Sequence, residues 1–151
     1  MEMNIEWIPS YKIAYFRHNG PYGLSNKQTM EHLKNWAASH DLLDDESVIL
    51  GIAQDDPAVT QPESCRYDAC LIVPDSFRVN DDSICLFTMA GGKYAVFKVS
   101  HTTEAVQKAW LEIFPALKNR GYQADDTKPI IEKYAAKILK DHRCEICVPV
   151  Y

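Results

Sequence analysis

The fold is decided by residues 92–117, which read GKYAVFKVSHTTEAVQKAWLEIFPAL. The apolar, β-branched run Tyr94–Val99 predicts a strand. After it, apolar residues recur at i, i+3, i+4, i+7, i+8 and i+11, which predicts an amphipathic helix with one buried face. They are Val106, Ala109, Trp110, Ile113, Phe114 and Leu117. We expect Thr102 or Thr103 to cap this helix, and Pro115 to kink or end it.

The same order of elements occurs earlier in the chain. Alternating apolar residues from Tyr11 predict a strand that stops at the turn signal Asn19-Gly20-Pro21, and helical spacing follows. The expected segments of the first half are Tyr11–Arg17, Leu24–His40, Val48–Ala53 and Tyr67–Val73, and those of the second half are Tyr94–Val99, Val106–Leu117, Ile130–Ala135 and Cys144–Val150. Strand, helix, strand, strand thus occurs twice, which indicates internal duplication.

We expect one α+β domain over residues 1–151, with halves at about 1–73 and 93–151. A further strand is expected at Ile84–Met89, in a hairpin with Tyr94–Val99 across Gly91-Gly92. The halves would share one curved antiparallel sheet of about eight strands, with both main helices packed on it. A central groove would lie between them, in a place where small-molecule sites are common.

Charge and hydropathy exclude several classes of protein. The chain has a net charge of −5 and no cluster of lysines and arginines, which disfavours binding to DNA, RNA or anionic lipid. No apolar run reaches the roughly 18 residues that span a bilayer, and glutamates stand where a signal peptide would carry lysines. We expect a cytoplasmic protein with no membrane and no direct DNA contact. Only about ten residues precede the first expected strand, too few for a helix-turn-helix domain.

The cysteines and histidines do not form a standard metal or cofactor motif. Cys144 and Cys147 make a C-x-x-C, but an expected strand sends them to opposite faces. Five cysteines scattered over apolar segments are typical of reduced core thiols. The histidines lack H-x-x-x-H and H-E-x-x-H spacing, and no phosphate-binding glycine loop is present. We therefore expect no metal and no cofactor.

Glu132 is the most informative polar residue. A strand here places Ile130, Glu132 and Tyr134 on one face, with the carboxylate between apolar neighbours. A buried carboxylate in that place would bind a cation or act as a general base, whereas the alternative is a strand glutamate that faces water. Eight tyrosines and three tryptophans supply flat surface for aromatic or cationic ligands, although each is equally suited to core packing.

Six motifs occur in order along essentially the whole chain. They are Asn19-Gly20-Pro21-Tyr22, Gly51 followed by Asp56-Pro57, Cys65–Cys70, Gly91–Val96, Trp110 and Pro129–Tyr134. Together they resemble the gyrase-inhibitor-like (GyrI-like) small-molecule-binding family, which includes the effector-binding domains of AraC- and MerR-type multidrug regulators. The resemblance implies a duplicated strand-helix-strand-strand fold, in agreement with the repeat described above.

The resemblance also implies a central groove for bulky hydrophobic or cationic ligands, with Glu132 as its acidic residue. Candidate walls are Tyr67, Tyr94, Tyr134, Trp36 and Trp110. We predict a stand-alone binding domain for drug- or toxin-like molecules. The first alternative is a hydrolase of cyclopropane-containing compounds, in which Glu132 activates water and a tyrosine donates a proton. The second is a protein-interaction module that inhibits DNA gyrase or acts through a partner regulator.

Overall fold

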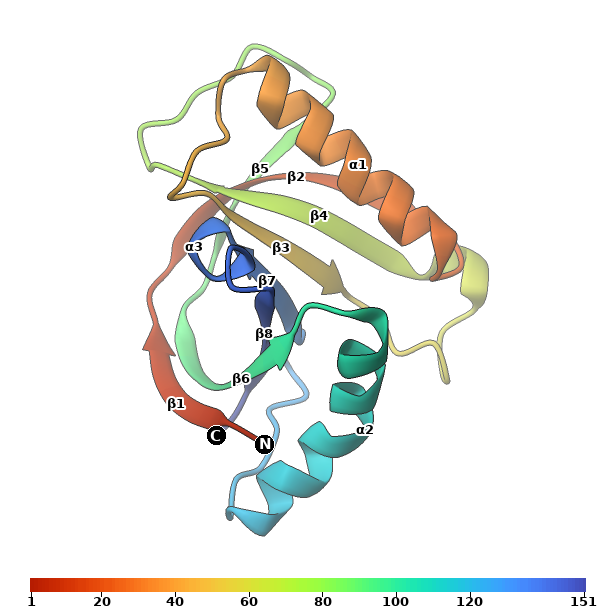
Figure 1. Ribbon diagram of the computed structural model, residues 1–151. Coiled ribbons are helices and arrows are strands. Elements are labelled where there is room, and N and C mark those ends of the chain that lie inside the picture. The colour runs from red at the N-terminus through yellow and green to blue at the C-terminus, as the bar shows by residue number, and fades with distance from the viewer.

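Eight strands form one antiparallel sheet in the order β1-β6-β8-β7-β3-β4-β2-β5. The computed structural model describes residues 1–151 and shows this sheet curled into a half-barrel (Figure 1). The strands are β1 Met3–Ile8, β2 Tyr11–Asn19, β3 Val48–Ala53, β4 Arg66–Val73, β5 Cys85–Met89, β6 Gly92–Ser100, β7 Ile131–Ala135 and β8 Arg143–Pro149. The expected α+β sheet is therefore confirmed.

Two main helices, α1 Leu24–Ser39 and α2 Thr103–Asn119, accompany the sheet, with a short α3 at Ala136–Leu139 and a 3-10 turn at Pro62–Ser64. Thr102 caps α2, because its hydroxyl oxygen accepts a hydrogen bond from the backbone N–H of Ala105. Of the two outcomes expected for Pro115, a kink or an end, the second does not occur, since the helix continues to Asn119. The carbonyl that Pro115 leaves unbonded belongs to Leu111, which is 80% exposed, so water can satisfy it. None of the helices is long and apolar enough to cross a membrane.

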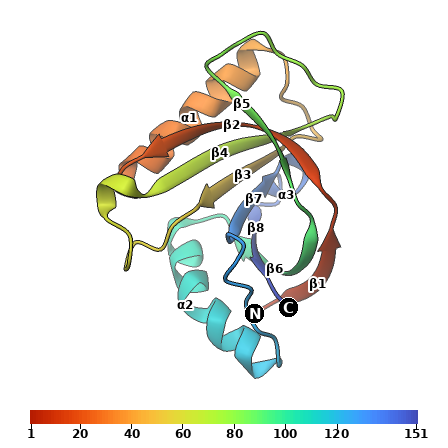
Figure 2. The ribbon, with the colours of Figure 1, turned by 180° about the vertical axis from the view of Figure 1, so that it is seen from behind.

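The strand-helix-strand-strand repeat is confirmed, and the sheet shows how the repeats join. β2-α1-β3-β4 and β6-α2-β7-β8 are the two units, and they meet where β7 pairs with β3. Each unit gains one further strand, which comes from the part of the chain that precedes the other unit. β1 precedes the first unit but pairs with β6 of the second, and β5 precedes the second unit but pairs with β2 of the first. Figure 2 shows β5 along β2 and, farther around the curl, β1 with β6. The outer strands are thus exchanged between the halves.

The expected hairpin between β5 and β6 is wrong, because β5 pairs with β2 instead. The Gly91-Gly92 pair serves a different purpose. A Cβ on Gly91 would lie 2.2 Å from the carbonyl oxygen of Ile8, so the β5–β6 connection packs directly on the β1–β2 connection. Glycine is needed where two backbones approach this closely. The expected strands also omitted β1, whose residues Met3–Ile8 include one acidic side chain, Glu6, and form the other edge of the sheet.

Packing of the two helices leaves the middle of one sheet face uncovered. α1 packs on β2 and β4, and α2 packs on β6. Two separate clusters of buried residues lie under the helices, one around Leu33 of α1 and one around Ile113 of α2. The central strands β3 and β7 lie between them (Figure 1). A third cluster, around Ile52, covers the opposite face of the sheet.

Candidate functional site

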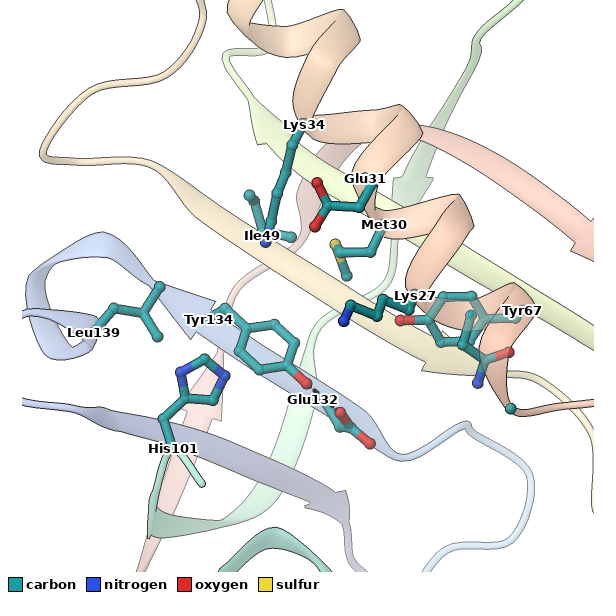
Figure 3. Close-up of a pocket in the computed structure, with 12 residues that line it drawn as sticks. Lys27, Met30, Glu31, Lys34, Ile49, Tyr67, His101, Glu132, Tyr134 and Leu139 are labelled. Carbon is teal, nitrogen blue, oxygen red and sulfur yellow. Dashed lines mark hydrogen bonds between the residues drawn. The ribbon is translucent and has the colours of Figure 1, made fainter. Parts of the chain in front are cut away.

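Glu132 lies on β7 at the centre of the uncovered strip. Its Cα is paired with that of Gly51 on β3, at the junction of the two halves. The alternation of β7 puts Glu132 and Tyr134 on one face, as expected, and this face is the helix side of the sheet. The Tyr134 hydroxyl donates a hydrogen bond to the Glu132 Oε2 (Figure 3). The half-buried carboxylate therefore has one protein partner, and it retains further lone pairs for a ligand.

Tyr67 reaches the same place from β4. A Cβ on Gly51 would lie 2.6 Å from the Tyr67 Oη, which shows that the hydroxyl lies directly over the glycine. Any larger residue on β3 would displace this hydroxyl. Gly51 thus makes room for a tyrosine beside the strand that carries Glu132.

Both tyrosines keep their protons well above neutral pH. Burial raises the pKa of Tyr134, and the negative charge of Glu132 and its hydrogen bond raise it further. Burial also raises the pKa of Tyr67, with a second contribution from the charge of Glu132. Two neutral hydroxyl groups and one carboxylate are therefore the polar groups at the floor of the site.

One cavity of about 400 Å³, here called the α1 cavity, opens between α1 and β7. Met30 and the charged residues Lys27, Glu31 and Lys34 reach it from α1, opposite Glu132 and Tyr134 (Figure 3). The His101 ring closes the far side, with its centroid 5.5 Å from that of Tyr134. The charged side chains that line the α1 cavity are balanced in sign, two lysines against two glutamates.

A second cavity of about 790 Å³, the α2 cavity, opens between α2 and the C-terminal end of the strand β3. Four aromatic residues line it: Tyr22, Tyr67, Trp110 and Phe114. Its charged lining is five carboxylates and one ammonium, from Asp55, Asp56, Asp125, Asp126, Glu132 and Lys128. Hydrogen bonds from Arg66 and Thr127 hold the pKa of Asp55 and of Asp125 below the usual range, so both are ionised at neutral pH. The lining of this cavity therefore carries an excess of negative charge.

The two cavities share Asn26, Tyr67 and Glu132 and so form one groove across the centre of the sheet. Asn26 brings a buried side-chain oxygen without a hydrogen-bond partner to this shared region. No group of three or more His, Cys, Asp or Glu side chains is placed to hold a metal ion. The groove therefore combines aromatic walls with one central carboxylate.

Four of the six predicted site residues meet in this groove: Glu132, Tyr134, Tyr67 and Trp110. Trp36 does not, because it is 8% exposed in the cluster under α1, where its Nε1 donates to Asp81 Oδ2 at 3.2 Å. Tyr94 is 2% exposed and belongs to the cluster on the opposite face of the sheet. Alternate residues of β6 point to opposite faces of the sheet, and Tyr94 is on the face that points away from both helices.

Several groove residues had no signal in the sequence. Asp55-Asp56 and Asp125-Asp126 lie in separate loops far apart in the chain, and only the fold brings them to one cavity. Asn26 and Lys27 stand on the face of α1 that lacks a regular apolar pattern. Gly51 was recognised as part of a motif, but its relation to Tyr67 depends on the pairing of β3 with β4.

Comparison with known proteins agrees with the motifs. The profile of the GyrI-like small molecule binding domain matches residues 1–151. The SPbeta prophage-derived protein YosT of Bacillus subtilis (strain 168), named as a candidate transcriptional regulator, is 41% identical over 151 residues and is covered to 99%, as is this chain. The EcmrR C-terminal domain superposes with a TM-score of 0.73 at 15% identity, covering 99% of this chain and 97% of that one.

A further solved structure, SAV2435 bound to tetraphenylphosphonium, superposes with a TM-score of 0.63 at 17% identity, covering 100% of this chain and 94% of that one. At these identities the two structures show a common fold. The sequence match over the full length shows more, and the chain belongs to the GyrI-like small molecule binding domain family.

Proposed function

We propose that the groove binds bulky hydrophobic cations, with Glu132 as the anionic anchor. The observation that carries this proposal is the position of one half-buried carboxylate where two cavities meet, among Tyr67, Tyr134 and Trp110. Aromatic faces attract cations through their quadrupoles, and a carboxylate in partly dry surroundings adds a direct charge contact. The ligand class is therefore drug- or toxin-like.

Three further observations support a cationic ligand. The lining of the α2 cavity has five carboxylates against one ammonium; Asp55 is paired with Arg66, and the other four carboxylates raise the local concentration of cations. The cavity volumes of about 400 Å³ and about 790 Å³ are within the usual range for drug-sized ligands. The structural relative SAV2435 was solved with tetraphenylphosphonium, a hydrophobic cation of this kind.

Calorimetric titration with tetraphenylphosphonium tests the proposal. We expect saturable binding to the wild-type chain, weakened roughly tenfold or more by Glu132→Gln, since a charge-assisted contact contributes about 1.5–3 kcal/mol. Glu31→Gln is the matched control, because Glu31 lines the same groove but is exposed on α1, where a charge contributes less. Equal affinity of the wild type and Glu132→Gln would remove Glu132 from the site.

Hydrolysis is a second candidate function, favoured by the hydrogen bond from Tyr134 to Glu132. A carboxylate paired with a protonated phenol is an arrangement suited to activating water and then donating a proton. Mass spectrometry of a cyclopropane-bearing electrophile incubated with the protein separates the two functions. Turnover beyond one equivalent, abolished by Glu132→Gln, would select the enzyme. Binding without product would select the binding domain.

The partner predictions remain to be tested in solution. With its net charge of −5 and no basic cluster in the sequence, we expect the chain alone not to bind duplex DNA. A titration at about 50 mM salt, where phosphate attraction is strongest, is the measurement. Binding tighter than about 1 μM that falls steeply by about 200 mM salt would contradict the expectation. Inhibition of gyrase stays an alternative without a surface feature that favours it.

A further inference from the structure

A third cavity, here called the rear cavity, lies on the face of the sheet opposite the groove. Its volume is about 460 Å³, and β2, β3, β4, β5 and β6 contribute to it. The walls are largely apolar, from Ile13, Ile52, Phe87, Met89, Tyr94 and Pro129. Phe87 is 57% exposed on the edge strand β5, so this wall has no other part of the chain covering it. Neither Glu132, Tyr134 nor a helix lines the rear cavity, although Gln54 and Lys128 line both it and the α2 cavity.

The polar floor of the rear cavity is built around Asp68, the acidic residue of the Cys65–Cys70 motif. Asp68 is 3% exposed and accepts three hydrogen bonds: from Arg17 Nε at 2.7 Å, from Arg17 Nη2 at 2.8 Å and from Gln54 Nε2 at 3.0 Å. Both of its oxygens are engaged. Asp68 is therefore neutralised by Arg17 and has little capacity left to attract a cation.

Arg17 presents its remaining surface to the cavity. Its side chain is 36% exposed, and its Nη1 makes no hydrogen bond within the protein. The guanidinium lies 5.7 Å from the centroid of the Tyr15 ring, which also lines the cavity. Because the two bonds to Asp68 fix the guanidinium, its free N–H groups are held in place for an acceptor.

Lys128 brings a second positive charge that no carboxylate neutralises by contact. Its Nζ makes no salt bridge or hydrogen bond within the protein, although the residue is half-buried. A Cβ on Gly92 would lie 2.6 Å from this Nζ and 4.0 Å from Tyr94 Cε2, so the ammonium stands beside the Tyr94 ring. The rear cavity thus carries two cationic side chains against one carboxylate that is fully paired.

We propose that the rear cavity is a second ligand site, which takes small organic anions with an apolar body, such as aromatic carboxylates. The apolar walls would receive the body of the ligand, while Lys128 and the free edge of Arg17 would receive its charge. A hydrophobic cation would instead meet an excess of positive charge there. The two faces of the sheet would therefore select ligands of opposite charge.

The probe for this site is 2-naphthoate, followed by calorimetry and by shifts of backbone amide signals. We expect saturable binding that perturbs residues 13–17 and 85–89. Lys128→Gln should weaken it roughly fivefold to tenfold through the lost charge contact, and Phe87→Ala should weaken it about threefold through the lost wall. Both side chains are at least partly exposed, so these variants are expected to fold.

Two controls separate the rear cavity from the groove. Lys93→Gln removes a neighbouring lysine whose Nζ donates to the Tyr151 carbonyl and does not line the cavity, and it should leave naphthoate affinity unchanged. Glu132→Gln and saturating tetraphenylphosphonium should also leave it unchanged. The proposal is overturned by absence of saturation up to about 5 mM, by equal affinity of wild type and Lys128→Gln, or by competition with tetraphenylphosphonium. Failure of the cation to bind the groove would leave this test intact.

Discussion

At the scale of single residues, Gly51 is the position whose substitution is most informative. Its Cβ would lie 2.6 Å from the Tyr67 hydroxyl oxygen, so Gly51→Ala should lower the free energy of unfolding by about 1–3 kcal/mol through overpacking. Urea unfolding measures this change. The double variant Gly51→Ala, Tyr67→Phe removes the clashing oxygen and should recover most of the loss. Additive losses in the double variant would show that the two groups do not collide.

Tyr134 offers a test of the charge on Glu132. Burial and the neighbouring carboxylate raise the pKa of Tyr134 above the ordinary value of 10.0, so Glu132→Gln should let this phenol ionise at a lower pH. Tyrosine ring carbon signals followed by NMR between about pH 9 and 12 give the measurement. Tyr94 is the internal control, since burial raises its pKa without a contribution from Glu132. Titration of Tyr134 at the same pH within this range in both forms would contradict the contact.

Residue-scale predictions from the sequence succeeded where alternation alone decides the outcome. Glu132 and Tyr134 share a face because they are two positions apart in a strand. The same rule could not tell which face carries the groove, because the strands are apolar on both sides, with clusters around Leu33 and Ile52. Tyr94 was therefore predicted to lie beside Glu132, although it lies on the other face.

At the scale of elements, the cap of α2 is a separable contribution to stability. Thr102→Ala removes the acceptor of the Ala105 N–H, 3.1 Å away, and should lower the free energy of unfolding by about 1 kcal/mol. Thr103→Ala changes the next residue, which is inside the helix and accepts no capping bond, and should change stability by much less. Thermal and urea unfolding compare the two. A larger loss for Thr103→Ala would place the cap elsewhere.

The helices and inner strands could be predicted because their periodicity is local. The apolar spacing around Ile113 matches a buried helix face, and Val48–Ala53 is apolar because β3 contributes buried side chains to both faces of the sheet, Ile49 to one and Ile52 to the other. Strand partners could not be predicted in the same way. Gly91-Gly92 has the composition of a hairpin turn, but the strands on its two sides pair with β2 and β1 at opposite ends of the sheet.

At the scale of the whole molecule, acid should weaken the fold. Hydrogen bonds from Arg66, Ser83 and Thr127 lower the pKa of Asp55, Asp81 and Asp125 below the ordinary value of 3.8. The unfolded chain takes up these protons first as the pH falls, so the stability that the three carboxylates contribute is present above about pH 4 and lost below it.

Urea midpoints at about pH 7, 5 and 3 measure this loss, and we expect the largest fall in the last interval. Burial raises the pKa of Glu145, which acts in the opposite direction but is a single group. Ser83→Ala removes the hydrogen bond from the Ser83 hydroxyl to Asp81 but keeps the one from the Ser83 backbone N–H, and it should make the fall smaller. The same midpoint at about pH 7 and 3 would rule out the three carboxylates as the source of acid sensitivity.

The exchange of outer strands between the halves also affects how the chain must fold during synthesis. β1 emerges from the ribosome first, yet its partner is β6, with Met3 aligned to Phe97. β2 likewise waits for β5 at its outer edge. A nascent first half therefore exposes two open strand edges until the second half arrives, and such long-range pairing slows folding and invites aggregation. Neither half is expected to be soluble when expressed alone, even though each contains a complete strand-helix-strand-strand unit.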